Sequence, residues 1–521
     1  MLRRTISHVA ACLLLAPGLS AQPTFRVTVR PEAAQGETSF SGRLVVYLLR
    51  EPNTLRSSPT PASGPFFVDP QPMVGLDVAG VGVLEEILVT DGTVDAFFPG
   101  PLSVLPAGRY TAQAVLDRAR LNSRWDREPG NLYSEPVSFT LLEGETTNID
   151  LRLDARVQAP PVRPAPGVEI VRASSPTLSR FRDRPTTLNA TVIYPIDYDD
   201  DRSYPAVYEI PGFGGDHLSG LRRAGRVLSR SLTPAEDELH RSAFWIVLDP
   251  EGPNGHHLFL NSPNNGPVAD ALINDLVPQL ERSFPLIAEP TARLLRGHSS
   301  GGWSTLHLAT AYPRTFGATW SSAPDPVDFG FFQRVDIYND ANFFQDAKGN
   351  EHPSYTARAG EVTMTIREEN LMEEVLGPDN SSAQQWDSWL AAFGGKDPET
   401  QNPVDLYSVL TGAIDRGVAE EYSLSDLHRR LLKSRAEVGR VYLSRVRLLV
   451  GDDDNFDLDN AVRSLRETVN ALSFYTLPEG RHGAIVITPD DDHSTILQSP
   501  EARDIPADMV AHLRRYNHAS R

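Results

Sequence analysis

The chain has 521 residues and is acidic, because 49 Lys plus Arg stand against 68 Asp plus Glu, which gives a formal charge of −19. This charge argues against nucleic acid or an anionic membrane as the main partner, since both require clustered cations. Hydrophobic residues make up 40% and charged residues 22% of the chain, a composition typical of folded domains. The single cysteine, Cys12, excludes a disulfide scaffold and a Cys-based zinc site, and we predict no metal and no organic cofactor.

Residues 1–21 have the pattern of a cleaved signal peptide. Two arginines open the segment, an apolar stretch covers residues 9–19, and small residues precede the expected cleavage point. The stretch contains Pro17 and is too short to span about 30 Å of hydrocarbon, so a membrane anchor is disfavoured. A lipobox ending at Cys12 is the weaker alternative, because most apolar residues follow the cysteine. We therefore expect a secreted or periplasmic protein without an integral membrane segment.

Residues 22–156 show short runs that alternate with period two, such as Phe25, Val27 and Val29. Gly and Pro punctuate these runs, as expected for antiparallel strands joined by turns, and the pattern predicts a β-sandwich domain. Residues 157–168 are rich in proline and predict a stiff linker at a domain boundary. The sandwich could bind a glycan or simply pack on the rest of the chain, and the sequence leaves both options open.

Residues 169–521 change rhythm and predict an α/β domain. Near-continuous apolar runs at 206–210 and 244–248 are typical of strands buried on both faces of a parallel sheet. Further expected strands alternate with helices. The expected strands are at 292–295, 318–321, 446–450 and 484–488, and the expected helices are at 268–284, 303–312 and 461–472. Residues 323–440 do not fit this alternation and predict a long, irregular, lid-like insertion, with Trp386 and Trp389 in a helix-like patch.

The motif Gly297-His298-Ser299-Ser300-Gly301 lies between an expected strand and an expected helix. A sharp strand-to-helix turn would expose the Ser299 hydroxyl, and glycines at the flanking positions would avoid clashes in that turn. The turn also directs the N-terminus of the helix toward an oxygen that becomes negative during acyl transfer. We predict Ser299 as the nucleophile, against the alternative of a plain glycine-rich turn.

A nucleophilic serine needs an acid and a histidine on loops after later strands. Gly451 to Asp457 follows the expected strand at 446–450, and we favour Asp454 as the acid, with Asp452, Asp453 and Asp457 as alternatives. An EF-hand calcium loop is excluded there, because its glycine and final glutamate are missing.

His493 follows the last expected strand and lies where the general base belongs. His482 precedes that strand and is the less favoured candidate. His256 and His257 lack carboxylate or cysteine neighbours at metal-binding spacing, and they have the pattern of loop histidines.

The second oxyanion donor is expected in the glycine-rich turn Pro211 to Asp216, which follows the strand at 206–210. The backbone N–H of Phe213 is the candidate, paired with that of Ser300. A turn with no catalytic part is the alternative interpretation.

From about Val168 onward the chain resembles the putative-esterase, enterochelin-esterase-like branch of the α/β hydrolases. Matching segments are Tyr204 to Tyr208, Gly212 to Gly215, Arg296 to Trp303, Tyr312-Pro313 with Phe316-Gly317, Gly451 to Phe456, and Asp492 to Ser494. The resemblance implies an α/β-hydrolase domain, Ser299 as nucleophile, Asp454 as acid, His493 as base, and an oxyanion hole at Phe213 and Ser300. Relatives cleave siderophore, feruloyl, acetyl and thiol esters, and some transfer acyl groups, so the substrate stays open.

These observations predict an exported serine esterase that forms an acyl-enzyme on a small-molecule or glycan-linked ester. A secreted acyltransferase would use the same residues but pass the acyl group to another hydroxyl. A non-catalytic binding protein would keep the fold without the chemistry. The sequence does not decide the oligomeric state.

Overall fold

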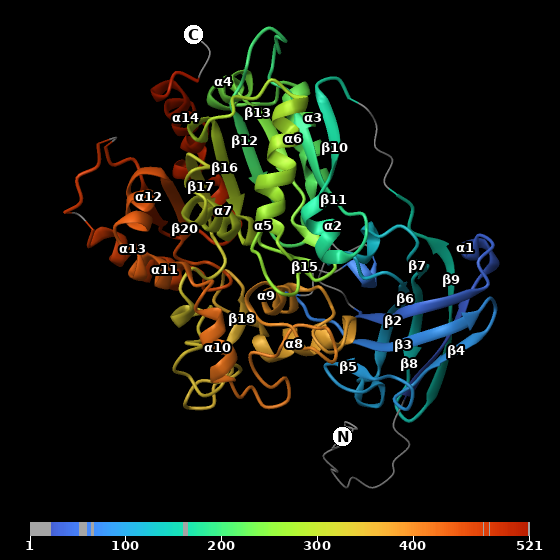
Figure 1. Ribbon diagram of the computed structural model, residues 1–521. Coiled ribbons are helices and arrows are strands. Elements are labelled where there is room, and N and C mark those ends of the chain that lie inside the picture. The colour runs from blue at the N-terminus through green and yellow to red at the C-terminus, as the bar shows by residue number, and fades with distance from the viewer. Residues whose placement is uncertain are drawn as a thin grey trace.

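The computed structural model describes residues 22–51, 60–63, 67–159, 165–472, 474–478 and 480–518 (Figure 1). The expected signal peptide and residues 160–164 of the expected linker lie outside these ranges. Within the described ranges, no helix combines the length and apolar character that a bilayer crossing requires.

The N-terminal part is a nine-stranded sheet, seen in blue and teal to one side in Figure 1. Its strands are β1 (Gln22–Val29), β2 (Ser39–Arg50), β3 (Met73–Gly82), β4 (Glu86–Val89), β5 (Ala96–Phe98), β6 (Gly108–Asp117), β7 (Leu132–Ser134), β8 (Val137–Leu141) and β9 (Thr146–Arg156), and a short helix α1 (Pro31–Ala34) follows β1. The order is β4-β1-β9-β7-β6-β2-β3-β5, with β8 also paired to β6. Apolar residues from β1 and β9 share one buried core with residues from β2, β3 and β6, so the sheet folds over itself.

One pairing in this sheet departs from the expectation of antiparallel strands. β1 and β9 are parallel, with Gln22 opposite Thr146 and Val29 opposite Leu153. A hairpin turn enforces antiparallel pairing only between strands that follow each other closely in the sequence. β1 and β9 are neighbours in the sheet, but they are the first and the last of its strands along the chain. The local period-two pattern carries no information about such a distant partner.

The second sheet has eight strands in the order β10-β11-β13-β12-β16-β17-β20-β21. Their bounds are β10 (Val168–Ser174), β11 (Thr187–Ile193), β12 (Ala206–Ile210), β13 (Phe244–Leu248), β16 (Arg293–His298), β17 (Ala318–Ser322), β20 (Val446–Gly451) and β21 (Ala484–Thr488). β10, β11 and β13 pair antiparallel, and all later pairs are parallel. The carboxyl ends of the parallel strands therefore meet at one edge, where ligands bind in such sheets.

Helices flank this sheet: α2 (Pro176–Arg182), α3 (Gly220–Leu228), α4 (Pro234–Ser242), α5 (Val268–Ala271), α6 (Val277–Ser283), α7 (Ser300–Ala311), α13 (Asp459–Asn470) and α14 (Pro500–Arg515). The helix expected at 268–284 is interrupted by a π-helical turn at Leu272–Leu276. α7 packs on β12, β16 and β17, and α14 packs on α4. The arrangement confirms the predicted fold class, an α/β-hydrolase domain preceded by a β-rich domain.

The insertion between β17 and β20 contains more regular structure than we expected from the sequence. It holds β18 (Pro353–Thr356), β19 (Val362–Thr365), α8 (Ile366–Leu376), α9 (Gln385–Phe393), α10 (Arg416–Tyr422), α11 (Leu427–Lys433) and α12 (Glu437–Arg445). Acids hide the helical periodicity of α8, because Glu369 and Glu373 are buried among its apolar residues. Glu373 accepts hydrogen bonds from the backbone N–H groups of Trp386 and Asp387, each at 2.9 Å, and so holds the first turn of α9.

The N-terminal sheet is fixed to the insertion by a buried arginine. Arg43 on β2 is fully buried, and its Nε donates to the Val375 carbonyl at the end of α8 at 2.9 Å. A second contact reaches the hydrolase domain, because Arg127 pairs with Asp216 at 2.9 Å in the loop after β12. The β-rich domain thus contacts both the insertion and the loop after β12.

Candidate active site

Ser299 stands at the turn between β16 and α7. Its backbone has φ 58° and ψ −128°, in the region that favours glycine, so the turn is strained. A Cβ at Gly297 would lie 2.2 Å from the Gly301 carbonyl oxygen, and a Cβ at Gly301 would lie 2.0 Å from the Ile210 carbonyl oxygen. Neither position has room for a side chain, which is the physical reason for the Gly-x-Ser-x-Gly spacing.

Asp454 and His493 form a hydrogen-bonded pair on the loops after β20 and β21. His493 Nδ1 lies 2.8 Å from Asp454 Oδ2, and the Phe456 N–H donates to Asp454 Oδ1 at 3.0 Å. The Asp454 side chain is fully buried, whereas 12% of the His493 side chain is exposed. In the part of the chain that the structure describes, no hydrogen bond joins Ser299 to His493, and such contacts often tighten only when substrate binds.

The pKa of His493 reflects two opposing effects. Burial favours the neutral ring, but the charge of Asp454 and its hydrogen bond outweigh burial, so the pKa of His493 is raised above 6.5. The ring of His298 lies 4.7 Å from that of His493. Burial, and then the neighbouring His493, lower the pKa of His298 well below 6.5. The His298 ring therefore stays neutral, whereas the His493 ring can accept a proton.

The alternative acids and the alternative base make other contacts. Asp452 accepts a backbone N–H from the loop after β21, and Asp453 is exposed. Asp457 pairs with Arg334 at 2.7 Å. His482 precedes β21, at the end of the strand opposite the loop that carries His493. Asp454 is therefore the member of the candidate set that contacts a candidate base.

The loop after β12 approaches the serine closely. A Cβ at Gly212 would lie 3.1 Å from the Ser299 Cβ, so the backbone of this loop passes directly beside the turn. Ser300 is the first residue of α7, and its N–H has no acceptor within the helix. The Phe213 N–H makes no hydrogen bond to any residue that the structure describes. Both donors are thus available to a ligand.

His256 is a supporting residue that the sequence did not reveal. It belongs to β15 (Gly255–His256), which pairs with β14 (Glu251–Gly252), and it is fully buried rather than on a loop surface. Its Nε2 lies 2.9 Å from the Pro211 carbonyl oxygen, and burial lowers the pKa of His256 to about 4. The neutral ring therefore holds the start of the loop that carries Phe213. Nothing local signals this contact, because it joins residues 45 positions apart.

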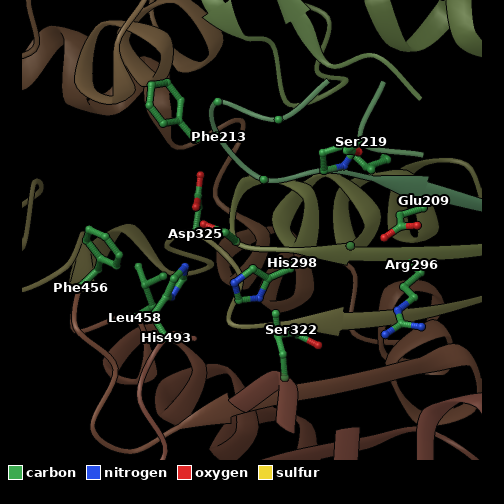
Figure 2. A pocket seen from close by; sticks show the side chains of 18 of the residues that line it. Glu209, Phe213, Ser219, Arg296, His298, Ser322, Asp325, Phe456, Leu458 and His493 are labelled. Atoms are coloured by element: carbon green, nitrogen blue, oxygen red, sulfur yellow. The ribbon is translucent and has the colours of Figure 1, made fainter. Parts of the chain in front are cut away.

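A cavity of about 1190 Å³ brings these residues together. Its lining includes Phe213, His298, Ser299, Asp325, Trp386, Trp389, Phe456 and His493. Figure 2 shows Phe456 and His493 at one end of the cavity, His298 in the middle, and Glu209 and Arg296 at the other end. The insertion supplies the two indoles, so it forms one wall of the cavity.

Asp325 is a buried acid in this cavity that the sequence analysis did not select. Its Oδ2 accepts a hydrogen bond from the Trp389 indole N–H at 2.7 Å, and its own N–H donates to the Ser299 carbonyl at 3.3 Å. Burial raises the pKa of Asp325 to about 6. A signal was present, because Asp325 closely follows the expected strand at 318–321.

The β-rich domain also lines the cavity, through Phe67, Arg124 and Arg127. The Phe67 ring lies 5.9 Å from that of Phe456, which in turn lies 4.9 Å from the ring of His493. The Phe67 carbonyl accepts a hydrogen bond from the Thr363 hydroxyl of the insertion at 2.7 Å. A residue of the first domain therefore supports the ring that packs on His493.

Replacing Phe67 by alanine is expected to weaken this support. Loss of this partly buried ring, which contacts both Tyr355 and Phe456, should cost about 1–2 kcal/mol of unfolding free energy and leave Phe456 less ordered beside His493. Chemical denaturation measures the first effect, and kcat/KM on a neutral ester measures the second. The exposed Phe474, replaced in the same way, serves as the control. Equal stability and kcat/KM in the two variants would show that Phe67 does not support the site.

The strained serine turn at the carboxyl edge of this sheet defines an α/β hydrolase. Residues 185–406 match the model of the family described as "Putative esterase". This match confirms the resemblance seen in the sequence and the predicted enzyme class, a serine hydrolase that cleaves carboxylic esters.

The solved structures similar to the chain include the following three. A ferulic acid esterase is 13% identical with a TM-score of 0.39, and covers 66% of this chain and 98% of its own. A fluorophosphonate-binding serine hydrolase of Staphylococcus aureus is 12% identical with a TM-score of 0.36, and the match covers 66% of this chain and 97% of that one. An S-formylglutathione hydrolase of the same organism is 13% identical with a TM-score of 0.35, and the match covers 66% of this chain and 98% of that one. At these values the likenesses carry no inference about the substrate. A comparison with curated proteins found no match.

Proposed function

We propose that this protein is an exported esterase that works through a triad of Ser299, His493 and Asp454. The 2.8 Å contact between His493 and Asp454, in the cavity that also contains the strained Ser299, carries this proposal. His493 takes the hydroxyl proton as Ser299 attacks the ester carbonyl, and Asp454 stabilises the imidazolium that forms.

Two backbone N–H groups then bind the negative oxygen of the tetrahedral intermediate. Phe213 supplies one from the loop beside the serine, and Ser300 supplies the other from the N-terminus of α7. His493 returns its proton to the leaving alcohol, and an acyl-enzyme remains on Ser299. Water, activated by the same histidine, releases the acid. No step requires a metal or an organic cofactor.

Export rests on the signal-like residues 1–21. Because the expected cleavage removes Cys12, the mature chain would have no thiol, and a hydroxyl nucleophile fits that composition. The domain boundaries expected at 22–156, 157–168 and 169–521 are part of the same proposal.

Hydrolysis of p-nitrophenyl acetate, together with acetyl, feruloyl and siderophore esters, tests the proposal. We expect release of acid from at least one ester, with an acyl adduct on the intact protein in mass spectra of rapidly quenched samples. Rates equal to those in buffer for every ester would contradict it.

An acyltransferase is the second candidate, because Trp386 and Trp389 line the cavity, and an acyl-enzyme that is shielded from water can pass its acyl group to another hydroxyl. In that case a sugar or lipid hydroxyl, added with the ester, would appear acylated and free acid would be the minor product. Free acid as the main product, whatever acceptor is added, would favour the hydrolase.

The activity of the proposed base should depend on pH in a defined direction. His493 acts only when neutral, and its pKa is raised above 6.5, so kcat/KM should rise with pH along a limb centred above pH 6.5. Replacing Asp454 by asparagine removes the charge that raises this pKa, so the limb should move to lower pH while the maximum falls. A limb that stays in place in Asp454→Asn would contradict the assignment.

A further inference from the structure

Two charged residues interrupt the apolar strands at the centre of the second sheet. Glu209 on β12 and Arg296 on β16 lie opposite each other in the parallel register. Central strands of such sheets are covered on both faces and normally carry apolar side chains. Burying a charge at such a position costs folding free energy unless the charge is paired. The residues around Glu209 and Arg296 therefore indicate the role of each charge.

Glu209 already has partners of its own. Arg223 on α3 holds it in a two-point contact, with Nε 2.8 Å and Nη2 2.9 Å from the two carboxylate oxygens. The Trp245 indole N–H also donates to this carboxylate. The Arg223 guanidinium stacks over the Trp245 ring at 4.1 Å. The carboxylate is therefore satisfied without Arg296.

Arg296 has no such partner. No ion pair or side-chain hydrogen bond joins it to any residue in the described ranges, and its guanidinium lies 5.7 Å from the Trp245 ring. The next charged residue across the sheet does have one: Arg447, opposite Trp320 on the neighbouring strand, pairs with Asp508 at 2.9 Å. Burial lowers the pKa of Arg296 to about 10, so the group still carries its charge at neutral pH.

The unpartnered guanidinium lines the same cavity as the serine. Arg296 and His298 are two positions apart on β16 and so face the same side of the sheet, and both are seen in the cavity in Figure 2. Three residues of strand separate the Cα atoms of Arg296 and Ser299, about 10 Å. An extended ligand could therefore reach both groups at once.

We propose that Arg296 forms an anion-binding subsite for a carboxylate carried by the ester substrate. This inference rests on the proposed esterase function and names a substrate class for it. A carboxylate rather than a phosphate dianion fits Arg296, because Glu209 and Arg223 neutralise each other and Arg296 adds a single positive charge to this pair of strands. The carboxylate carbon and the reacting carbonyl carbon would be the two ends of a chain of about six carbons.

Matched ester pairs test the subsite. On the acyl side the pair is the p-nitrophenyl monoester of hexanedioic acid and the same compound with its free carboxylate converted to an amide. On the alcohol side the pair is ω-acetoxyhexanoate and its amide. We expect kcat/KM for the carboxylate to exceed that for the amide by about 10-fold or more in one pair, since charge-assisted hydrogen bonds contribute at that level. The pair that shows it identifies which part of the ester carries the anion.

The variants Arg296→Gln and Arg296→Lys connect the preference to this residue. The carboxylate-to-amide ratio should fall to about one in Arg296→Gln and be partly kept in Arg296→Lys, which retains the charge but not the planar fork. Arg447→Gln, the control from the same face of the sheet, should keep the full ratio. Thermal melting identifies any variant that does not fold, and the lysine variant still tests the charge if the glutamine variant fails.

A binding measurement separates this inference from the esterase proposal. Calorimetry of Ser299→Ala with hexanedioate should show binding that Arg296→Gln, added to the same chain, abolishes. If hexanedioate binds but no ester is cleaved by the unmodified chain, the esterase proposal fails and the subsite stands. Equal kcat/KM for carboxylate and amide in both pairs, without hexanedioate binding, would overturn the subsite.

Discussion

Replacing Ser299 by alanine is expected to lower kcat for p-nitrophenyl acetate by about 10⁵- to 10⁶-fold. The change removes the atom that would form the acyl-enzyme, whereas the backbone donors of Phe213 and Ser300 remain and would support a small residual rate. Initial rates at saturating ester, with the protein quantified by absorbance, measure the loss. Far-ultraviolet circular dichroism should be unchanged, because the Ser299 hydroxyl makes no hydrogen bond within the described part of the chain.

Ser494 provides a matched control for this variant. It is an exposed serine next to His493, and its side chain holds none of the groups in the cavity. Ser494→Ala should keep kcat within about twofold, as expected for a change at an exposed side chain. If Ser299→Ala retained the full rate, acyl transfer through this serine would be excluded.

Replacing Gly301 by alanine should strongly destabilise the fold around the serine. The added Cβ would lie 2.0 Å from the Ile210 carbonyl and 2.6 Å from the Pro211 carbonyl, both of them backbone atoms that cannot rotate away. The N-terminus of α7 would have to move off β12, at a cost of about 3 kcal/mol or more. Urea denaturation of the purified variant, followed by tryptophan fluorescence, measures this loss.

Gly225 offers the opposite case for comparison. It is exposed on α3, and a Cβ there would meet no atom within 4 Å. Alanine should therefore stabilise the helix by up to about 1 kcal/mol, because glycine is the poorer helix former. Unchanged urea midpoints for Gly301→Ala would mean that the turn does not require glycine at this position.

The parts of the site that the sequence predicted are those whose signal is local. The Gly-x-Ser-x-Gly spacing follows from contacts within one turn and with the strand beside it, so the five residues 297–301 contain the whole signal. Asp454 and His493 were selected because each follows an expected strand, and β20 and β21 are indeed neighbours in the sheet. Their catalytic roles, and those of Phe213 and Ser300, stay predictions until variants are measured.

The parts that the sequence did not predict depend on contacts between distant segments. Phe67 reaches the cavity from the first domain, and His256 holds the loop after β12 across 45 positions. Helix α8 of the insertion escaped detection because buried acids such as Glu373 interrupt its apolar pattern. The sequence shows that Arg296 is a charged residue on an expected strand, directly before the serine motif. That Arg296 lacks an ion-pair partner among the described residues can be seen only in the folded chain.

Covalent labelling with a fluorophosphonate, followed by proteolysis and mass spectrometry, tests the proposed triad most directly. The reagent reacts only with a serine that a neighbouring base activates, so it reports the Ser299, His493 and Asp454 arrangement without any assumption about the substrate. We predict one label per chain, on Ser299, and loss of labelling in His493→Ala. A label on a different residue, or ester hydrolysis that continues while Ser299 stays unlabelled, would contradict the triad.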